Sequence, residues 1–402
     1  MNRLLPIFSL LLSPLAFGNT TVPVGYNNIV LVPQSDTIIG VPFHRNPTYI
    51  YTIVDVDASA ETIEVNATIP ADAFNGALLG SDQFYLRVKD GPREGMWYHI
   101  VDHTADTFTV DSANDSDFEI IDSNGASDTQ TLEVVPYWTL DTLLANGASL
   151  EPATGTTATD LDPAQGAVLT EVFFLTPEGP QTFSSSPNGG LELRANNRFV
   201  YLDNGSDTGW IDANDPTDGA GNPKVQGDVA FAPDSIFFLR NNLPDPGDES
   251  NNLSITTSGT VPDSDYATIF SLQAPTTTAE DIFFSNPYPV DLCLNDTGLS
   301  SPGSFFNAST SFRSPGGDFV LIYDRITDHA SGRINRAADD IFFYYDGSDA
   351  TIPFGPGWYN VNEKYSGEVG DQKVIPASGG LGVRKRATPV PGDGVVQSNK
   401  PY

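Results

Sequence analysis

The amino-acid sequence predicts an all-β protein with two β-sandwich or barrel-like domains, built from short antiparallel strands and tight turns. The 402 residues include 36 glycines and 31 prolines, which are scattered between short apolar runs, as is typical of turns. Those runs are rich in Val, Ile, Phe, Tyr and Thr, the residues that favour strands. Apolar residues rarely recur at helical spacing, so we expect short helices only at residues 70–79 and 138–146.

The segment FYLRVKDGPREGMWYHIVDHTADTFTV (residues 84–110) shows how individual strands are identified. Apolar and polar side chains alternate from residue 84 to residue 89, which gives this strand one apolar face. The turn residues DGPREG follow, then a return strand at 96–101 and a third strand at 107–110. The segment therefore predicts a β-meander. Together with GYNNIVLVP, DTIIGVPF, YIYTIVDVD and TLEVVPYW, it predicts a compact N-terminal β domain.

The predicted organisation follows from the shifts in composition along the chain. Residues 145–167 (ANGASLEPATGTTATDLDPAQGA) lack large apolar residues apart from isolated leucines, as in a linker or long loop. The polar stretch at 242–265 offers an alternative division of the C-terminal half. The predicted units are a signal peptide at 1–18, an N-terminal β domain at 19–144, the linker at 145–167, a C-terminal β domain at 168–387 and a loose tail at 388–402.

The N-terminus, MNRLLPIFSLLLSPLAFGNT, has the pattern of a secretory signal peptide. Arg3 supplies the positive charge, an apolar run follows, and Ala16 and Gly18 provide the small residues that signal peptidase requires. No later run approaches the length of a membrane-spanning helix. We expect a secreted protein of the extracellular space or outer cell surface, with no membrane insertion after signal removal.

The charge balance narrows the classes of partner. Asp and Glu number 52 against 19 Lys and Arg, for a net charge of −33. Such a chain repels phosphate backbones, so nucleic acid is not an expected partner. The single cysteine, Cys293, excludes an intramolecular disulfide, and a chain of this length does not need one.

Two kinds of phrase recur. An acidic residue shortly before Phe-Phe occurs in TEVFFLTPEG, DSIFFLRNN, EDIFFSNPY and DDIFFYYDG, and SPNGGLELRANN (186–197) echoes PASGGLGVRKRA (376–387). Their spacing is uneven, so they indicate recurring strand-and-turn units and not a solenoid.

Several phrases occur together in a fixed order: SDTIIGVPFHR, the segment 84–110, VVPYWTLDTLL and VIPASGGLGVRKRA. As a set they resemble an uncharacterised family of secreted β-rich proteins, often present as many paralogues, in Verrucomicrobia-type bacteria. The similarity covers residues 22–144 and about 318–386, while residues 145–265 diverge. The resemblance implies export, a β-rich fold and a surface or extracellular role, and it carries over no activity and no functional residues.

One acidic loop is a candidate calcium site. The segment DNGSDTGWIDANDPTDGAGN (203–222) concentrates oxygen ligands of the kind that calcium prefers. It is not an EF-hand, since Pro216 stands at a ligand position and no Glu closes the loop at Pro223. Asp and Asn also favour turns for local reasons, so ordinary turns are the alternative. The candidate ligands are Asp203, Asp207, Asp212, Asn214, Asp215 and Asp218.

A second candidate site is an aromatic platform for sugars. In FGPGWYN (354–360) the Gly-Pro-Gly sequence leaves little local structure to bury the rings of Trp358 and Tyr359. Exposed rings can stack on pyranose faces, although most Trp and Tyr residues of β proteins belong to the core.

Other chemistry is weaker in the sequence. His99 and His103 form H-x-x-x-H on a strand and turn, where we expect ordinary sheet histidines and no metal site. The triplet Arg384–Arg386 is the one basic cluster and could dock an acidic partner, or lie solvated on a last strand. No nucleophile elbow, H-E-x-x-H motif or P-loop occurs.

These observations predict a non-catalytic extracellular or cell-surface structural or adhesion protein. Its expected partners are cell-surface components, copies of itself or extracellular polysaccharide. Its expected cofactor is either none or structural calcium. The first alternative is an extracellular carbohydrate-binding module. The second is a glycan-active hydrolase, because a pair of catalytic carboxylates cannot be recognised from sequence alone.

Overall fold

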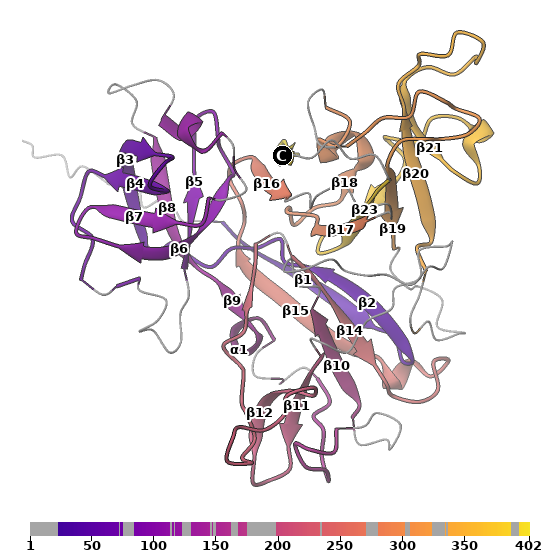
Figure 1. Cartoon of the computed structure of the whole chain (residues 1–402). Helices are drawn as coiled ribbons and strands as arrows, with labels where there is room; N and C mark the ends of the chain where they lie inside the picture. Colours follow the sequence, from indigo (N-terminus) through magenta and orange to yellow (C-terminus); the bar gives the residue numbers. More distant parts are fainter. Residues whose placement is uncertain are drawn as a thin grey trace, which may run out of the picture.

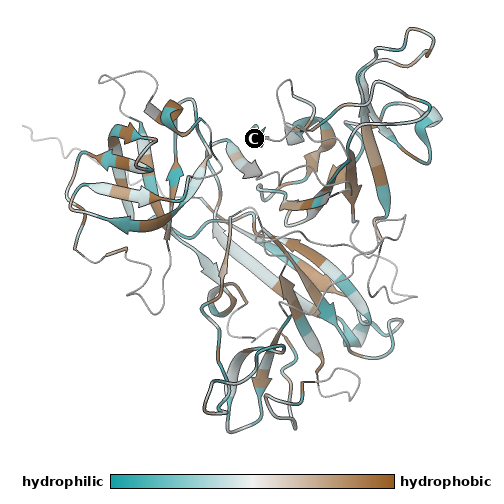
Figure 2. Cartoon of the chain, in the orientation of Figure 1, coloured by the Kyte–Doolittle hydropathy of each residue, from teal (hydrophilic) through white to brown (hydrophobic). Residues whose placement is uncertain are grey.

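The chain is all-β, as predicted (Figure 1). The computed structural model describes residues 23–71, 73–74, 84–112, 115, 117–122, 130–144, 147, 150–161, 168–174, 198–233, 235–270, 280–301, 306–323, 334, 337–386 and 394–402. They form a closed barrel and two sandwiches, each with a five-stranded sheet and a two-stranded ribbon. Figure 2 shows hydrophobic segments along the strands of all three lobes. No helix within these ranges is long and apolar enough to cross a membrane.

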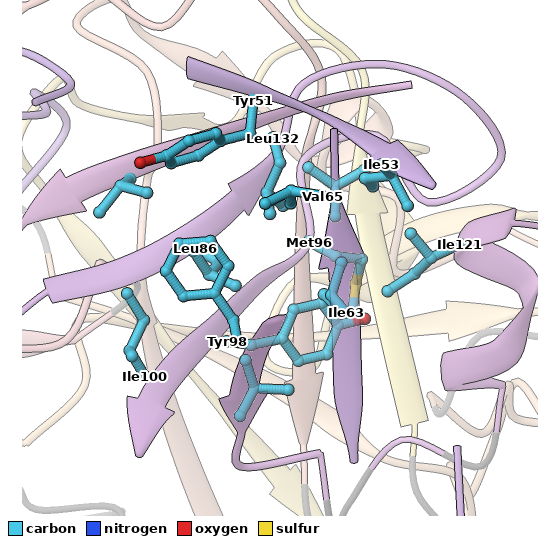
Figure 3. Close-up of a cluster of buried hydrophobic side chains, with 14 of the residues drawn as sticks. Tyr51, Ile53, Ile63, Val65, Leu86, Met96, Tyr98, Ile100, Ile121 and Leu132 are labelled. Atoms are coloured by element: carbon cyan, nitrogen blue, oxygen red, sulfur yellow. The ribbon is translucent and has the colours of Figure 1, made fainter. Parts of the chain in front are cut away.

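The barrel contains the predicted meander. Its strands are β3 (Tyr49–Asp57), β4 (Thr62–Val65), β5 (Phe84–Val88), β6 (Trp97–His103), β7 (Thr107–Val110) and β8 (Thr131–Pro136), with the 3-10 helix η1 (Phe118–Asp122) near β3. Strands β5, β6 and β7 pair antiparallel in sequence, and β8 closes the barrel against β3. Alternating side chains such as Leu86, Tyr98 and Ile100 fill the interior (Figure 3).

The first sandwich contains strands that precede the barrel in the sequence and strands that follow it, between residues 24 and 260. Its sheet contains β12 (Thr208–Asp212), β11 (Arg198–Asp203), β10 (Thr170–Phe174), β14 (Ile236–Asn241) and β2 (Ser35–Gly40), in that spatial order. Its ribbon pairs β1 (Val24–Leu31) with β15 (Leu253–Thr260), and a short pair joins β9 (Trp138–Thr139) to β13 (Ala230–Phe231). Two short helices complete it, α1 (Leu140–Leu143) and η5 (Glu249–Asn251).

The second sandwich occupies residues 266–398. Its sheet contains β17 (Glu280–Ser285), β23 (Gly380–Lys385), β19 (Phe319–Ile322), β20 (Asp340–Tyr345) and β21 (Gly357–Asn360). Its ribbon pairs β16 (Tyr266–Phe270) with β24 (Gly394–Ser398), and its short pair joins β18 (Leu292–Cys293) to β22 (Val374–Ile375). The short helices are η6 (Leu294–Thr297) and η7 (Lys364–Ser366).

The two sandwiches are an internal duplication. Read from one edge, their sheets run β2-β14-β10-β11-β12 and β17-β23-β19-β20-β21, the same order of first, last, second, third and fourth strand. The ribbons correspond, as do the short pairs, and α1 after β9 corresponds to η6 after β18. Each unit also has one parallel bridge at the same place, Ala153 to Leu202 and Ser309 to Tyr345.

The register of the strands matches residue by residue. Tyr201 faces Trp210 across β11 and β12, and Tyr344 faces Trp358 across β20 and β21. Each Tyr–Trp pair has ring centroids 5.3 Å apart in an edge-on arrangement. The duplication therefore extends to the geometry of individual side chains.

The cores of the two sandwiches correspond in the same way, although several matched positions differ in residue type. The matched pairs are Ile39 and Phe284, Leu140 and Leu294, Leu150 and Phe306, Val172 and Val320, Phe174 and Ile322, Phe199 and Phe342, Tyr201 and Tyr344, Trp210 and Trp358, Phe231 and Ile375, Phe237 and Leu381, and Leu239 and Val383. Apolar character is retained at all of these positions, and aromatic rings replace aliphatic side chains at several of them.

The two sheets pack on each other with approximate two-fold symmetry. Ile38 and Phe238 of the first unit share an apolar cluster with Leu321 of the second. Counterpart residues touch at the centre: a Cβ built on Gly40 would lie 2.5 Å from the Cβ of its counterpart Ser285. Contacts between a residue and its own counterpart are the mark of an isologous interface.

The barrel breaks this symmetry. It is inserted between β2 and β10 of the first sandwich, yet it docks on the ribbon of the second. Ala267 of β16 belongs to the barrel's core cluster, and Val395 of β24 packs against that cluster. Among the residues that the structure describes, the second sandwich has β18 and η6 at the corresponding point of its chain, between β17 and β19.

Strand pairing divides the chain differently from the predicted domains. β1, β2 and β9 lie before residue 144 but pair with β15, β14 and β13, which lie after residue 168. The change from the first sandwich to the second falls at residues 261–265, at the end of the predicted alternative division. The predicted signal peptide lies outside the described residues, as does part of the linker at 145–167.

The predicted loose tail and helices also differ from the structure. Residues 394–398 form β24, and the Lys400 backbone N–H donates to Asp265 Oδ1 over 2.9 Å. The helix expected at 138–146 is limited to Leu140–Leu143, where Thr139 caps it. Most of the segment 70–79 lies outside the described residues.

The recurring Phe-Phe phrases do not mark the duplication. They lie on β10, β14, β17 and β20, and none of these strands is the counterpart of another. The echo at 186–197 lies outside the described residues. Phenylalanine favours strands in general, and the phrase occurs on the edge strand β17 as well as inside the sheets.

Candidate functional site

The residues of the candidate calcium loop are spread along β11, β12 and the turns that follow them. Asp203 ends β11 and Asp207 lies in the β11–β12 turn, where the side chain of Asn204 accepts the Asp207 backbone N–H over 2.8 Å. Asp212 ends β12 and accepts the backbone N–H of Asn214 over 2.9 Å. These are local turn interactions of the Asx type.

The rest of the loop is also engaged locally. Asp215 forms an exposed ion pair with Lys224. Asp218 Oδ1 accepts the backbone N–H groups of Ala220 and Asn222, each over 2.9 Å. Hydrogen bonds from the Asn222 side chain and these backbone groups lower the pKa of Asp218.

The described residues contain no group of three or more His, Cys, Asp and Glu side chains arranged to hold a metal ion. The geometry thus supports the alternative of ordinary turns at residues 203–222, and calcium binding there stays a prediction.

The prediction of an exposed platform at Trp358 and Tyr359 is wrong. Trp358 is 0% exposed and Tyr359 is 2% exposed. Trp358 packs between Phe306 and Tyr344 in the core of the second sandwich. The Gly-Pro-Gly segment leads directly into β21, which pairs with β20. Successive side chains of a strand point to opposite faces of the sheet, and both faces are covered here, so the rings of Trp358 and Tyr359 are buried in different clusters.

The segment that follows β21 does expose an aromatic side chain. Tyr365 in η7 is 65% exposed and lies with its ring centroid 6.2 Å from that of Phe354. Phe354 in turn stacks on the buried Phe312 at 4.7 Å. All four tryptophans of the chain are described, and none is exposed. Tyr365 is therefore the aromatic residue that this region offers to a ligand.

The predicted basic cluster is part of the scaffold. Arg384 binds Asp281 through two hydrogen bonds of 2.6 Å across β23 and β17. Lys385 forms a buried ion pair with Asp318. Arg386 donates to the Pro315 carbonyl over 2.7 Å. Arg384 and Lys385 are thus committed to carboxylates of their own sheet, which leaves Arg386 as the exposed member of the cluster.

His99 and His103 lie on β6 and do not share a site. His99 Nδ1 lies 3.2 Å from Tyr137 Oη, and burial lowers the pKa of His99. His103 Nε2 accepts the Phe74 backbone N–H over 3.3 Å, while Nδ1 lies 2.9 Å from the Thr104 carbonyl. Both imidazoles thus make separate structural contacts.

The most unusual polar site lies where the three lobes meet. His44, in the link from β2 to the barrel, is buried, and its Nδ1 lies 2.8 Å from Tyr85 Oη. Its backbone N–H and carbonyl bond to Thr260 at the end of β15 over 3.1 and 2.8 Å. Burial, then the charges of Arg87 and Lys89, hold the pKa of His44 well below 6.5.

The barrel side of this junction carries two cations that contact residues 263 and 264, in the link between the two sandwiches. Arg87 forms a 3.3 Å ion pair with Glu133 and also donates to the Ser264 hydroxyl. Lys89 contacts Glu133 at 3.4 Å and pairs with Asp263. The imidazole of His44, the phenol of Tyr85 and the cations Arg87 and Lys89 thus connect the barrel to the rest of the chain. We call this group of contacts the latch.

Stability is expected to fall as the pH drops below 6.5, through His44. The folded protein holds this imidazole neutral, so protons bind mainly to the unfolded chain below the ordinary pKa of 6.5. The free energy of unfolding is expected to fall by about 1.4 kcal/mol per pH unit until the pH reaches the pKa of His44 in the folded protein. Urea unfolding between about pH 7 and pH 5.5 measures this slope, above the range in which most carboxylates titrate.

His44→Asn is the control for this slope, because asparagine offers hydrogen-bonding atoms near Tyr85 but does not titrate. The variant is expected to be less stable at neutral pH and to show a flatter profile. A profile as steep as that of the natural protein would assign the acid sensitivity to other groups.

Sequence reasoning missed this junction. Arg87 and Ser264 are 177 positions apart, and Lys89 and Asp263 are 174 apart. The available signal was two neighbouring cations, Arg87 on β5 and Lys89 just after it. The alternation of residues 84–89 predicts one polar face, but Arg87 on that face is buried and contacts Glu133 and Ser264.

Comparisons with protein-family models, with curated proteins and with solved structures find no match to this chain. The resemblance of the phrases at 22–144 and 318–386 to secreted Verrucomicrobia-type proteins thus stays a prediction. Functional inference depends on the chain's own residues.

Proposed function

We propose that this is a secreted, non-catalytic structural or adhesion protein of the cell exterior or outer cell surface. Its partners would be cell-surface components, copies of itself or extracellular polysaccharide. The observation that carries the proposal is that the barrel and the two sandwiches pack against one another. Two duplicated sheets pack face to face, the barrel packs on Ala267 and Val395 of the second sandwich, and Arg87 and Lys89 bind the link between the sandwiches.

The distribution of charge supports the same role. Cations in the sheets are paired internally, so much of the excess of 52 acidic over 19 basic residues remains for the surface. Such a surface repels anionic lipids and nucleic acids and favours neutral partners or contacts bridged by cations. The internal pairs are Arg198 with Glu171, Arg240 with Asp36, and Arg384 with Asp281.

Retention of the purified protein tests the proposal. It would be applied to host cell envelopes and to a panel of insoluble polysaccharides, with calcium and with a chelator. A structural or adhesion role is expected to give retention on envelopes. Retention on one polysaccharide alone would favour the carbohydrate-binding function, and release of new reducing ends would identify a hydrolase.

Carbohydrate binding is the second candidate, and the exposure of Tyr365 is the observation that favours it. A sugar bound by this sandwich would stack on that ring. Tyr365→Ala is then expected to reduce retention about tenfold, a value taken by analogy with bases, whose stacking on an aromatic ring contributes about 1–3 kcal/mol. Tyr402→Ala, which removes another exposed tyrosine, is the matched control. Equal retention by both variants and the natural protein would exclude Tyr365 as the platform.

A further inference from the structure

The second sandwich buries a lysine against a carboxylate between two of its central strands. Lys385 ends β23, and Asp318 directly precedes β19, which pairs with β23 in the sheet. The two side chains are 3% and 1% exposed, and the Lys385 ammonium donates to Asp318 Oδ2. A primary amine and a carboxyl group are therefore in contact at a place that water hardly reaches.

Other lysine ion pairs that the structure describes are more open to solvent. Lys373 pairs with Asp340 in the same sheet over 2.6 Å, and their side chains are 17% and 29% exposed. Lys89 and Lys224 also pair with carboxylates, and their side chains are 24% and 43% exposed. Burial, and not contact alone, thus distinguishes the pair of Lys385 and Asp318.

The Asp318 carboxylate is held in place by two backbone N–H groups. Asn307 N–H donates to Oδ2 over 2.7 Å, and Arg386 N–H donates to Oδ1 over 3.0 Å. Backbone donors at a carboxyl group stabilise the negative charge that develops on its oxygens when a nucleophile attacks the carbon. They also keep the carboxyl group within reach of Lys385 Nζ, which lowers the entropic cost of a reaction between the two.

A second acidic residue stands on the other side of Lys385. Glu280 is its register partner on β17, so Glu280, Lys385 and Asp318 form one row across β17, β23 and β19. Residues directly opposite each other in an antiparallel pair lie on the same face of the sheet. The corresponding row of the first sandwich has no charged residue, so the fold does not by itself require charges there.

We propose that Lys385 and Asp318 become joined by an isopeptide bond after the chain has folded. Burial disfavours charged forms, which favours transfer of a proton from the ammonium to the carboxylate. The neutral amine Nζ attacks Cγ of Asp318, and Glu280 carries a proton from the nitrogen to the hydroxyl group that leaves as water. One ammonium and one carboxylate thus give one amide and one water, without oxidation, reduction or a co-reactant.

The bond ties two neighbouring strands of the sheet together. Lys385 and Asp318 are 67 positions apart, so the cross-link closes a long loop and constrains the unfolded chain as a disulfide does. The chain has a single cysteine and cannot form an intramolecular disulfide. The isopeptide bond supplies covalent reinforcement by another route, and its formation does not depend on the proposed surface role.

Mass spectrometry of the purified natural protein tests the bond directly. Under denaturing conditions, we expect an intact mass lower by one water molecule than the mass calculated from the determined N-terminus. Trypsin cleaves after unmodified Lys and Arg, so a digest is expected to contain residues 314–325 joined to Lys385. The full mass, with these two peptides separate, would overturn the proposal.

Matched substitutions separate the bond from the ion pair. Lys385→Arg keeps the positive charge but has no amine to attack the carboxyl group, so it is expected to retain the full mass. Lys373→Arg changes the more exposed pair of the same sheet and is expected to lose one water, as the natural protein does. Loss of water in Lys385→Arg would place the reaction elsewhere in the chain and overturn the proposal.

Glu280→Gln tests the transfer of the proton. Glutamine cannot accept and release a proton, so this variant is expected to keep the full mass, with Lys385 and Asp318 as an ion pair. It is also expected to unfold at lower urea concentration than the cross-linked protein, and it is the reference for the ionic pair when Asp318 is substituted. A cross-link formed in Glu280→Gln as completely as in the natural protein would overturn the assignment of proton transfer to Glu280.

Discussion

Replacing Trp358 with alanine is expected to lower the free energy of unfolding by about 3–5 kcal/mol. The side chain is fully buried between Phe306 and Tyr344, so its removal leaves a cavity that the surrounding β-sheet cannot close. Its counterpart Trp210 holds the same position in the first sandwich, and Trp210→Ala should cost a similar amount. Urea unfolding followed by circular dichroism measures both.

Two further variants sharpen this test. Tyr365→Ala removes an exposed ring and is expected to change stability by less than about 0.5 kcal/mol. Trp358→Phe should cost less than Trp358→Ala, because it keeps aromatic bulk and removes an indole N–H that has no acceptor among the described residues. Unchanged stability in Trp358→Ala would mean that the ring is not in the core and would reopen the platform at residues 354–360.

Replacing Asp318 with alanine is expected to cost about 3–5 kcal/mol, because it removes the buried carboxylate that pairs with the buried ammonium of Lys385. Both side chains of this ion pair are almost fully buried. Asp318 also accepts the backbone N–H groups of Asn307 and Arg386 over 2.7 and 3.0 Å. One substitution thus removes a buried ion pair and two hydrogen bonds from backbone N–H groups to the same carboxylate.

The duplication supplies a matched rescue for Asp318→Ala. At the register positions of Glu280, Lys385 and Asp318, the first sandwich has the neutral residues Ser35, Asn241 and Thr170. The triple variant Glu280→Ser, Lys385→Asn and Asp318→Thr copies that neutral row. It is expected to recover most of the stability lost in Asp318→Ala, since neutral polar groups cost less to bury than an ammonium that has lost a buried carboxylate.

Urea unfolding of the two proteins side by side gives the result. A triple variant no more stable than Asp318→Ala would mean that the rows are not interchangeable and that the sandwiches differ in more than charge. A single variant as stable as the natural protein would contradict the burial of Lys385.

Local patterns were sufficient to predict the class of fold and much of the barrel. The alternation from residue 84 to residue 89 and the turn DGPREG identify strands because pleating and turn geometry depend on neighbouring residues. The antiparallel pairing of β5, β6 and β7 follows the same local logic, since each strand is joined to the next by a short turn.

The candidate sites required information that neighbouring residues do not carry. Trp358 follows Gly-Pro-Gly, which suggests exposure, but its burial depends on Phe306, which lies 52 positions away. Asp218 resembles a calcium ligand by composition, yet backbone N–H groups of its own turn occupy its carboxylate. The sequence shows which side chains could bind a ligand, but the contacts that they make in the folded protein decide whether they are available to do so.

The sequence by itself determined the strands, the turns and the acidic charge of this protein, because these depend on residue type and short-range order. Only the tertiary structure decided the duplication, the docking of the barrel and the latch at His44. Matched core positions retain apolar character, but several differ in residue type, so the equivalence of Ile39 and Phe284 is visible only in strand register. Long-range pairing, as between β1 and β15, decides which faces are buried and which remain open to a partner.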